Sequence, residues 1–182
     1  MSPDPDLRER TIALVGLMGV GKSTIGRRLA AALGLPFRDA DQEIEKAAGR
    51  SISEIFAERG EEEFRAGERR VIARLLDEGP HVLSTGGGAF MNPKTRALIR
   101  EKAVSVWLKA DLEVLVRRVS RKDTRPLLAG RDPREVLERL MIERYPVYAL
   151  ADIVVETDDR PAGATVETIM DALKRRPQAA AG

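Results

Sequence analysis

The sequence contains no cysteine, which excludes disulfide bonds, thiolate metal ligands and a thiol nucleophile. Aromatic residues make up only 4% of the chain and no dense basic stripe accompanies them, so no nucleic-acid partner is expected. No apolar run is long enough to span a membrane, and the polar first segment, MSPDPDLRER, does not resemble a signal peptide. We therefore expect no membrane partner and a cytoplasmic location.

Length and composition are those of one globular domain. The 182 residues are 43% hydrophobic and 33% charged, which is enough apolar material for a real core. The formal net charge of +2 favours no particular partner. We expect one domain over residues 1–182, with a core at 11–175 and flexible ends at 1–8 and 177–182. The oligomeric state leaves no mark in the sequence, and a monomer is the expectation.

The most informative segment is residues 16–23, GLMGVGKS, which match the P-loop pattern. A short β-rich stretch at 11–15 precedes the segment, and a helical pattern follows it and ends at a glycine and a proline. In such a loop, backbone N–H groups and the helix N-terminus face phosphates, Lys22 reaches the β and γ oxygens, and Ser23 ligates Mg²⁺. The segment therefore predicts a site for ATP or GTP with magnesium; the alternative is a chance match in a glycine-rich turn.

Strand and helix patterns alternate along the chain without an internal repeat. The sequence predicts strands at 11–16, 36–39, 81–84, 103–108 and 151–155. It predicts helices at 22–34, 42–48, 51–78 (interrupted near Gly60 and Gly67), 93–100, 111–118, 133–148 and 162–175. This alternation predicts a three-layer α/β/α fold, in which helices cover both faces of a five-stranded parallel sheet.

Two carboxylates follow the second predicted strand. Asp39 and Asp41 are two positions apart, so in extended chain both face the cleft beyond the strand ends. One suits the magnesium shell, and the other suits the orientation or deprotonation of an attacking hydroxyl. Asp39 is alternatively a helix cap, since Gln42 follows three residues later. The third strand lacks the acidic residue of a usual Walker B motif, which favours Asp39 near the metal.

Three consecutive glycines, Gly86, Gly87 and Gly88, follow the third predicted strand. They indicate either a close approach of the backbone to a ligand or a flexible turn. The longest polar interruption, residues 119–131, predicts a mobile lid. Arg125 within it is placed to bring positive charge to a transferring phosphoryl group.

Two further arginines allow two interpretations each. Arg65 lies among acidic residues and by itself resembles solvated surface, while Arg144 has Glu138 and Glu143 as ordinary ion-pair partners. A pair of arginines is nevertheless suited to bidentate binding of a substrate carboxylate. The only histidine, His81, is assigned no chemistry.

Six motifs together resemble the shikimate kinase family, over about residues 11 to 172. They are GLMGVGKST at 16–24, DAD at 39–41, EFR at 63–65, TGGG at 85–88, RPLL at 125–128 and ERYPVYALAD at 143–152. The resemblance implies a P-loop kinase fold of the nucleoside monophosphate kinase type. Its sheet has strand order 2-3-1-4-5, its substrate-binding helical subdomain spans about 39–70, and its lid spans about 119–131. It also implies transfer of the ATP γ-phosphoryl group to the 3-hydroxyl of shikimate, in the pathway to chorismate and the aromatic amino acids.

The resemblance also implies which residues bind ATP and Mg²⁺. The nucleotide would contact Gly19, Val20, Gly21, Lys22, Ser23, Thr24, Arg118, Arg125 and Arg160. Mg²⁺ would be held by Ser23 and, through water, by Asp39. Arg118 would pack on one face of adenine, with residues 159–161 on the other, and Arg125 would swing in with the lid.

The acceptor site follows from the same resemblance. Shikimate would contact Asp41, Arg65, Gly86, Gly87, Gly88 and Arg144. Arg65 and Arg144 would clamp its carboxylate, and Asp41 would hydrogen-bond its hydroxyls and is the candidate base. Lys22, Asp41 and Arg125 would be the catalytic residues.

Two other functions compete with this prediction. Another small-metabolite P-loop kinase, such as a gluconate kinase, shares the P-loop but has less reason to carry both arginines with DAD and TGGG. A non-catalytic nucleotide-binding regulator is disfavoured because Lys22, Ser23, Asp39, Asp41 and Arg125 are all intact.

Overall fold

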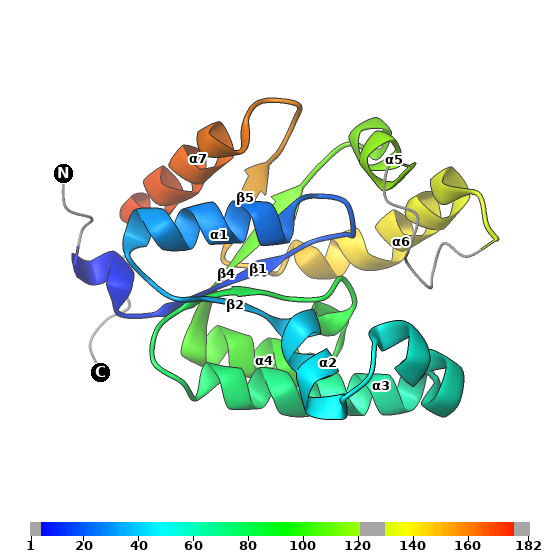
Figure 1. The fold of residues 1–182 in the computed structure, drawn as a ribbon. Helices are drawn as coiled ribbons and strands as arrows, with labels where there is room; N and C mark the ends of the chain where they lie inside the picture. Colours follow the sequence, from blue (N-terminus) through cyan, green and yellow to red (C-terminus); the bar gives the residue numbers. More distant parts are fainter. Residues whose placement is uncertain (1–4, 121–129, 177–182) are drawn as a thin grey trace.

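The computed structural model describes residues 5–120 and 130–176 and has the predicted three-layer α/β/α architecture (Figure 1). Five parallel strands form one sheet in the order β2-β3-β1-β4-β5, as predicted. The strands are β1 (Thr11–Val15), β2 (Phe37–Asp39), β3 (Val82–Ser84), β4 (Ala103–Lys109) and β5 (Ile153–Glu156). The helices are α1 (Lys22–Leu33), α2 (Ala40–Ala48), α3 (Ile52–Leu76), α4 (Pro93–Lys102), α5 (Leu112–Ser120), α6 (Pro133–Tyr148) and α7 (Ala162–Arg175).

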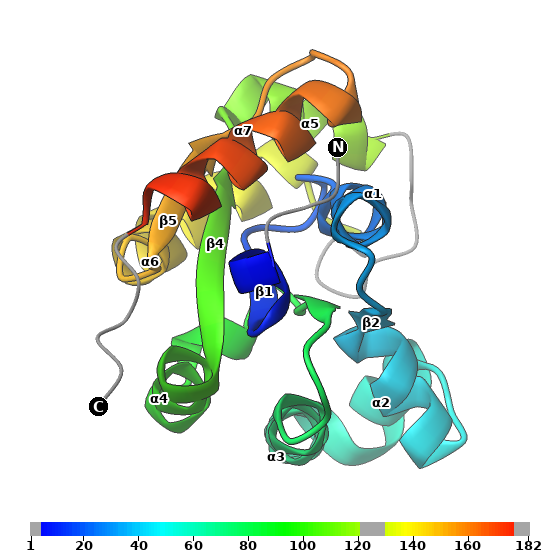
Figure 2. The same ribbon diagram turned by 90° about the vertical axis from the view of Figure 1, so that its left-hand side faces the viewer.

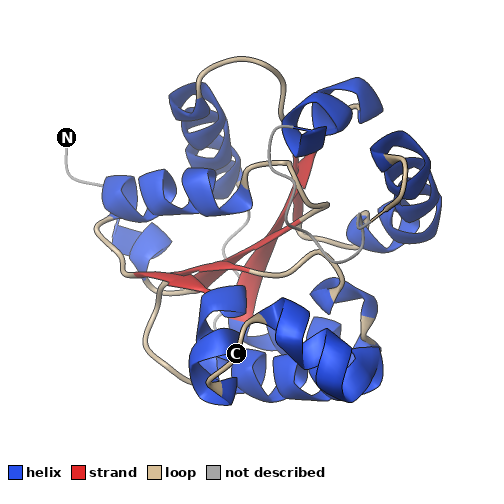
Figure 3. Cartoon of the chain, turned by 45° about the vertical axis from the view of Figure 1, so that its right-hand side comes forward, coloured by secondary structure: helices blue, strands red, loops and turns tan. Residues whose placement is uncertain are grey.

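The central strands are buried because helices cover both faces of the sheet (Figure 3). All five residues of β1 are buried, and β1 pairs with β3 and β4, which places Ile12 opposite Val82 and Val104. Helices α1 and α7 lie on one face, and α3 and α4 lie on the other (Figures 1 and 2). Parallel strands bring their carboxyl ends to one edge, where the connecting loops form a site.

The boundaries of the predicted elements agree with the structure to within two residues. Helix α3 is interrupted at Gly60 (φ 84°, ψ 171°) but continues regularly through Gly67, so one of the two expected interruptions is absent. The helix breaks at Gly60 because that residue has a positive φ, which residues with a Cβ atom rarely adopt, whereas Gly67 has no positive φ. The short 3-10 helix η2 (Ala89–Met91), after the glycine run, was not predicted.

The N-terminal segment is more ordered than expected. Residues 5–8 of the segment expected to be flexible form the 3-10 helix η1 (Pro5–Arg8). Arg8 Nε donates to the carbonyl oxygen of Leu33 (2.8 Å), because the last carbonyls of α1 lack partners within the helix. Of the expected lid, residues 119–120 end α5. Residues 1–4, 121–129 and 177–182 lie outside the described part of the chain.

The core lies between the sheet and its helices. Leu14, Leu83 and Val106, from three adjacent strands, are completely buried, and Leu29 of α1 packs in the same cluster. In the two described stretches, no helix is both long and apolar enough to cross a membrane. The buried cluster packs beneath the end of the sheet at which the carboxyl ends of the strands and their loops meet.

Candidate active site

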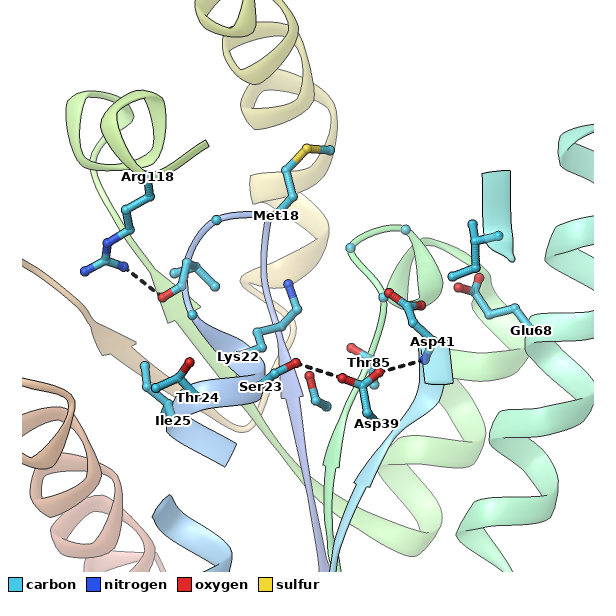
Figure 4. A pocket seen from close by; sticks show the side chains of 18 of the residues that line it. Met18, Lys22, Ser23, Thr24, Ile25, Asp39, Asp41, Glu68, Thr85 and Arg118 are labelled. Carbon is cyan, nitrogen blue, oxygen red and sulfur yellow. Dashed lines mark hydrogen bonds between the residues drawn. The ribbon is translucent and has the colours of Figure 1, made fainter. Parts of the chain in front are cut away.

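A cavity of about 740 Å³ is bounded by the P-loop, the ends of β2 and β3, helices α3 and α6, and the β5–α7 loop (Figure 4). Every predicted site residue in the described part of the chain lines it: Gly19, Val20, Gly21, Lys22, Ser23, Thr24, Asp39, Asp41, Arg65, Gly86, Gly87, Gly88, Arg118, Arg144 and Arg160. Arg125 lies outside the described residues. The fold thus brings the predicted nucleotide and acceptor residues into one cavity.

The P-loop turns sharply into the N-terminus of α1. Several of its glycines have positive φ angles, and Gly21 adopts the left-handed conformation directly before the helix. A Cβ atom on Gly16 would lie 2.7 Å from the carbonyl oxygen of Leu108, so only glycine fits there. Lys22 Nζ donates to the carbonyl oxygens of Gly16 (2.7 Å) and Leu17 (3.0 Å). The loop therefore holds an ammonium group beside a helix N-terminus, an arrangement suited to phosphates.

Asp39 caps α2, which confirms one of its two predicted roles, while its place near a magnesium ion stays a prediction. Its Oδ1 accepts hydrogen bonds from the backbone N–H groups of Asp41 (2.9 Å) and Gln42 (3.3 Å), which caps α2. Its Oδ2 accepts a hydrogen bond from Ser23 Oγ (2.8 Å), as Figure 4 shows. A hydroxyl and a carboxylate side by side are hard oxygen donors, which Mg²⁺ prefers, so these two residues fit a magnesium site.

At the predicted nucleotide end, Arg118 joins two loops that are far apart in the sequence. Its Nη1 donates to the carbonyl oxygen of Val20 (2.9 Å) and its Nη2 to that of Asp158 (2.8 Å). The β5–α7 loop is further organised by Arg160, whose Nε donates to the Asp158 carboxylate (2.9 Å). The planar guanidinium of Arg118 is therefore held at the cavity wall, where a flat base can stack on it.

At the predicted acceptor end, Arg65 of α3 and Arg144 of α6 both line the cavity, and both approach the glycine run. Arg65 Nη1 donates to Glu68 Oε1 (2.9 Å), and its side chain is only 23% exposed, so it is not a solvated surface residue. Arg144 is 8% exposed, and its Nη1 is buried without a hydrogen bond. A buried cation with an unused donor calls for an anionic ligand.

The glycine run is what lets these arginines approach. A Cβ atom on Gly87 would lie 3.0 Å from Nη1 of Arg144. One on Gly88 would lie 2.6 Å from Cζ of Arg65, which is too close for any real contact. The glycine run is therefore a place of close approach to protein side chains, while the predicted close approach to a ligand stays a prediction. The partner groups are protein side chains at the edge of the cavity.

Sequence reasoning missed Glu68. This carboxylate is 2% exposed, and its Oε2 is buried without a hydrogen bond. Desolvation raises its pKa, and the charge and hydrogen bond of Arg65 oppose that rise. A Cβ atom on Gly86 would lie 3.1 Å from Glu68 Oε2 and 2.9 Å from Asp41 Oδ1, so both carboxylates border the glycine run. The available signal was the i, i+3 spacing from Arg65, which puts both side chains on one helical face.

Known proteins resemble this chain over almost its whole length. The family model for shikimate kinase matches residues 18–174. A shikimate kinase of Caulobacter vibrioides is 70% identical over 169 residues, covering 93% of this chain and 84% of the relative. One of Paramagnetospirillum magneticum is 60% identical, covering 90% and 84%. The solved shikimate kinase from Acinetobacter baumannii in complex with shikimate aligns with a TM-score of 0.89 at 35% identity, covering 93% of this chain and 96% of that one.

The stretch of this chain that matches the family model contains residues from both ends of the cavity. A match confined to the P-loop would indicate nucleotide binding alone, since that motif occurs with many activities. Here the matched stretch also contains the glycine run and the arginines of α3 and α6. The resemblance inferred from the six motifs is confirmed, and the chain belongs to the shikimate kinase family.

Proposed function

We propose that this chain transfers the γ-phosphoryl group of ATP to the 3-hydroxyl of shikimate, giving shikimate 3-phosphate and ADP. The observation that carries the proposal is the shared cavity, in which a P-loop faces two arginines and an aspartate. It is supported by relatives that are shikimate kinases, one of them solved with shikimate. The reaction belongs to the pathway to chorismate and the aromatic amino acids.

At the nucleotide end, Lys22 and the P-loop N–H groups bind the β and γ phosphates, and Arg118 and Arg160 border the adenine. Ser23 and Asp39 would hold Mg²⁺, which when bound neutralises negative charge on the phosphates. Arg125 retains its predicted role of stabilising the transferring group from the lid.

At the acceptor end, Arg65 and Arg144 bind the shikimate carboxylate and Asp41 accepts a hydrogen bond from the 3-hydroxyl. The hydroxyl oxygen forms a bond to the γ-phosphorus while the bond to the β–γ bridging oxygen breaks, and ADP leaves. The hydroxyl proton passes to Asp41 and then to solvent. In a loose transition state little proton removal is needed early, so alignment of the hydroxyl is the larger contribution of Asp41.

Glu68 holds Arg65, one of the two arginines that would bind the carboxylate, in position before the acceptor binds. Its hydrogen bond from Arg65 (2.9 Å) holds that guanidinium in the cavity wall. A side chain already held in place loses less conformational freedom when it binds a ligand, which strengthens binding. We therefore assign Glu68 a positioning role for Arg65.

The assigned groups all come from one chain, so a monomer is sufficient for the reaction. Both substrates are small molecules, and the assigned chemistry uses no nucleic acid and no membrane. Because ATP and hydroxy acids are metabolites of the cytoplasm, we propose that the protein acts there.

The test is ADP formation by the purified protein with ATP and Mg²⁺, alone and with shikimate or gluconate added separately. A Lys22→Ala variant purified in the same way measures contaminating ATPase activity, since it lacks the phosphate-binding ammonium group. We expect a large increase with shikimate only, and identification of shikimate 3-phosphate as the product. An increase with gluconate only would overturn the proposed acceptor, and no increase with either would overturn the proposed transfer.

A further inference from the structure

Tyr148, at the end of α6, lies directly behind the acceptor end of the cavity. It is 1% exposed, and it follows Arg144 by one helical turn, so the two side chains share a face of α6. Within the described residues, Arg144, Gly87 and Gly88 line the cavity, whereas Tyr148 does not. It is therefore placed to act on groups that touch the acceptor without touching the acceptor itself.

The Tyr148 hydroxyl connects two of those groups. It donates a hydrogen bond to the carbonyl oxygen of Gly87. Burial raises the pKa of Tyr148 to about 12, so the hydroxyl keeps its proton at neutral pH and remains a donor. The positive charge of Arg144, one helical turn away, lowers the pKa of the same hydroxyl and so opposes part of the effect of burial. The hydroxyl thus binds the glycine run at Gly87, the same residue on which an added Cβ would lie 3.0 Å from Arg144 Nη1.

This contact determines the direction of a backbone N–H group. The peptide bonds of the described residues are trans, so the N–H of Gly88 points away from the carbonyl of Gly87. Since that carbonyl points to Tyr148, behind the cavity wall, the Gly88 N–H points to the cavity side. A glycine run can rotate its peptide groups easily, so this orientation requires an anchor.

The anchor itself is rigid. The ring of Tyr148 packs against Trp107 (centroids 5.7 Å apart) and Tyr145 (6.2 Å). Trp107 in turn contacts Tyr145 edge to face (4.8 Å), and Tyr145 donates to the carbonyl oxygen of Ala110 (2.7 Å). Three interlocked rings leave the Tyr148 hydroxyl little freedom to move.

We propose that Tyr148 is a positioning residue for the acceptor carboxylate, because its hydroxyl orients both the Arg144 guanidinium and the Gly87–Gly88 peptide toward the cavity. This inference deepens the proposed function and rests on it. It assigns to Tyr148 an effect on acceptor affinity and none on the nucleotide. Its removal should therefore change one substrate constant and leave the other unaltered.

The experiment compares Tyr148→Phe with Tyr145→Phe. Both variants lose one hydroxyl that donates to a backbone carbonyl, in the same aromatic cluster, but only the Tyr148 hydroxyl binds the glycine run; Tyr145 is half-buried. In both, KM is measured for shikimate at saturating ATP and for ATP at saturating shikimate, alongside the unfolding temperature. We expect Tyr148→Phe to raise the shikimate KM about tenfold, the lower end for loss of a supporting hydrogen bond, with an unaltered ATP KM. We expect Tyr145→Phe to leave both constants unaltered.

A double variant tests the route of the effect. If Tyr148 acts through Arg144, the cost of Tyr148→Phe should shrink in an Arg144→Lys background, since the oriented guanidinium is already gone. Equal effects of both tyrosine variants on the shikimate KM, or no effect of Tyr148→Phe in an active, folded protein, would overturn the inference alone. A wild-type protein without shikimate-dependent ADP formation would overturn the proposed function, and this inference with it.

Discussion

Gly88→Ala should damage acceptor binding through one steric contact. Gly88 has φ −94° and ψ −6°, which alanine adopts without strain, so the backbone tolerates the change. The added Cβ would lie 2.6 Å from Cζ and Nη1 of Arg65, about 1 Å closer than ordinary carbon contacts of ~3.5–4.0 Å. Arg65 is the flexible partner and must move, so the carboxylate clamp is displaced while the fold remains.

The size of the effect follows from that displacement. A shift of ~1 Å in a substrate-positioning group can reduce rates about 100-fold. A lost hydrogen bond to a charged group is worth about 1.5–3 kcal/mol, or roughly 10- to 150-fold in affinity. We expect kcat/KM for shikimate to fall about 10- to 100-fold, mainly through KM. The free energy of unfolding should change by less than about 1 kcal/mol, the usual range for glycine to alanine at a permitted conformation.

The assay is ADP release with each substrate varied in turn, together with thermal unfolding. Gly79→Ala is the matched control, because a Cβ atom there would meet no atom within 4 Å. The control should keep both KM values, and Gly88→Ala should keep the KM for ATP. A shikimate KM for Gly88→Ala equal to that of the control would refute the assignment of Arg65 to the carboxylate.

Four further predictions concern single residues. Arg125→Ala should lower kcat about 10³-fold with ATP affinity retained, which single-turnover rates and nucleotide titration measure; near-normal turnover would refute the lid role. Asp41→Asn should abolish transfer with an unchanged unfolding temperature, and wild-type activity would remove Asp41 from the site. Asp39→Asn keeps an oxygen that can cap α2 but loses the negative charge beside Ser23. The unfolding temperature should therefore stay the same, while kcat falls at least about tenfold and a higher Mg²⁺ concentration is needed for activity. An Mg²⁺ dependence equal to that of the wild type would contradict this prediction. Burial raises the folded-state pKa of Glu68 above 4.5, so the folded protein holds that proton more tightly, and its contribution to stability falls as pH rises from 4.5 through the folded pKa. As the pH rises through that window, the unfolding temperature of Glu68→Gln should therefore rise relative to that of the wild type. A difference between the two unfolding temperatures that does not change with pH would contradict the burial argument.

For Asp39, the local sequence could not distinguish a helix cap from a metal ligand. A carboxylate followed by Gln42 satisfies the rules for a helix cap, and a carboxylate after a strand satisfies those for a metal site. The structure shows the cap at one carboxylate oxygen and a hydrogen bond from Ser23 at the other, so the cap leaves the second oxygen facing the P-loop. The end of β2 must lie beside the P-loop for this to happen, and only the pairing order of the sheet determines that.

Glu68 and Tyr148 were missed for a related reason. Glu68 stands in a charged stretch of α3 that resembles solvated surface, yet it is 2% exposed. Tyr148 belongs to a motif that supported the family resemblance, but nothing in the motif indicates which carbonyl its hydroxyl reaches. Burial of a polar side chain depends on what packs over it, and those neighbours are distant in sequence.

The sequence by itself determined the P-loop, the alternation of strands and helices, and hence the parallel sheet. These features depend on hydrogen bonds and apolar periodicity between residues a few positions apart, so the local pattern contains them. The family resemblance predicted that Arg65 and Arg144 share one ligand, but only the tertiary structure decided which groups surround them: the glycine run that both approach and the buried Glu68 that binds Arg65. That arrangement depends on distances between elements remote in the chain, which arise only when the helices pack against the sheet.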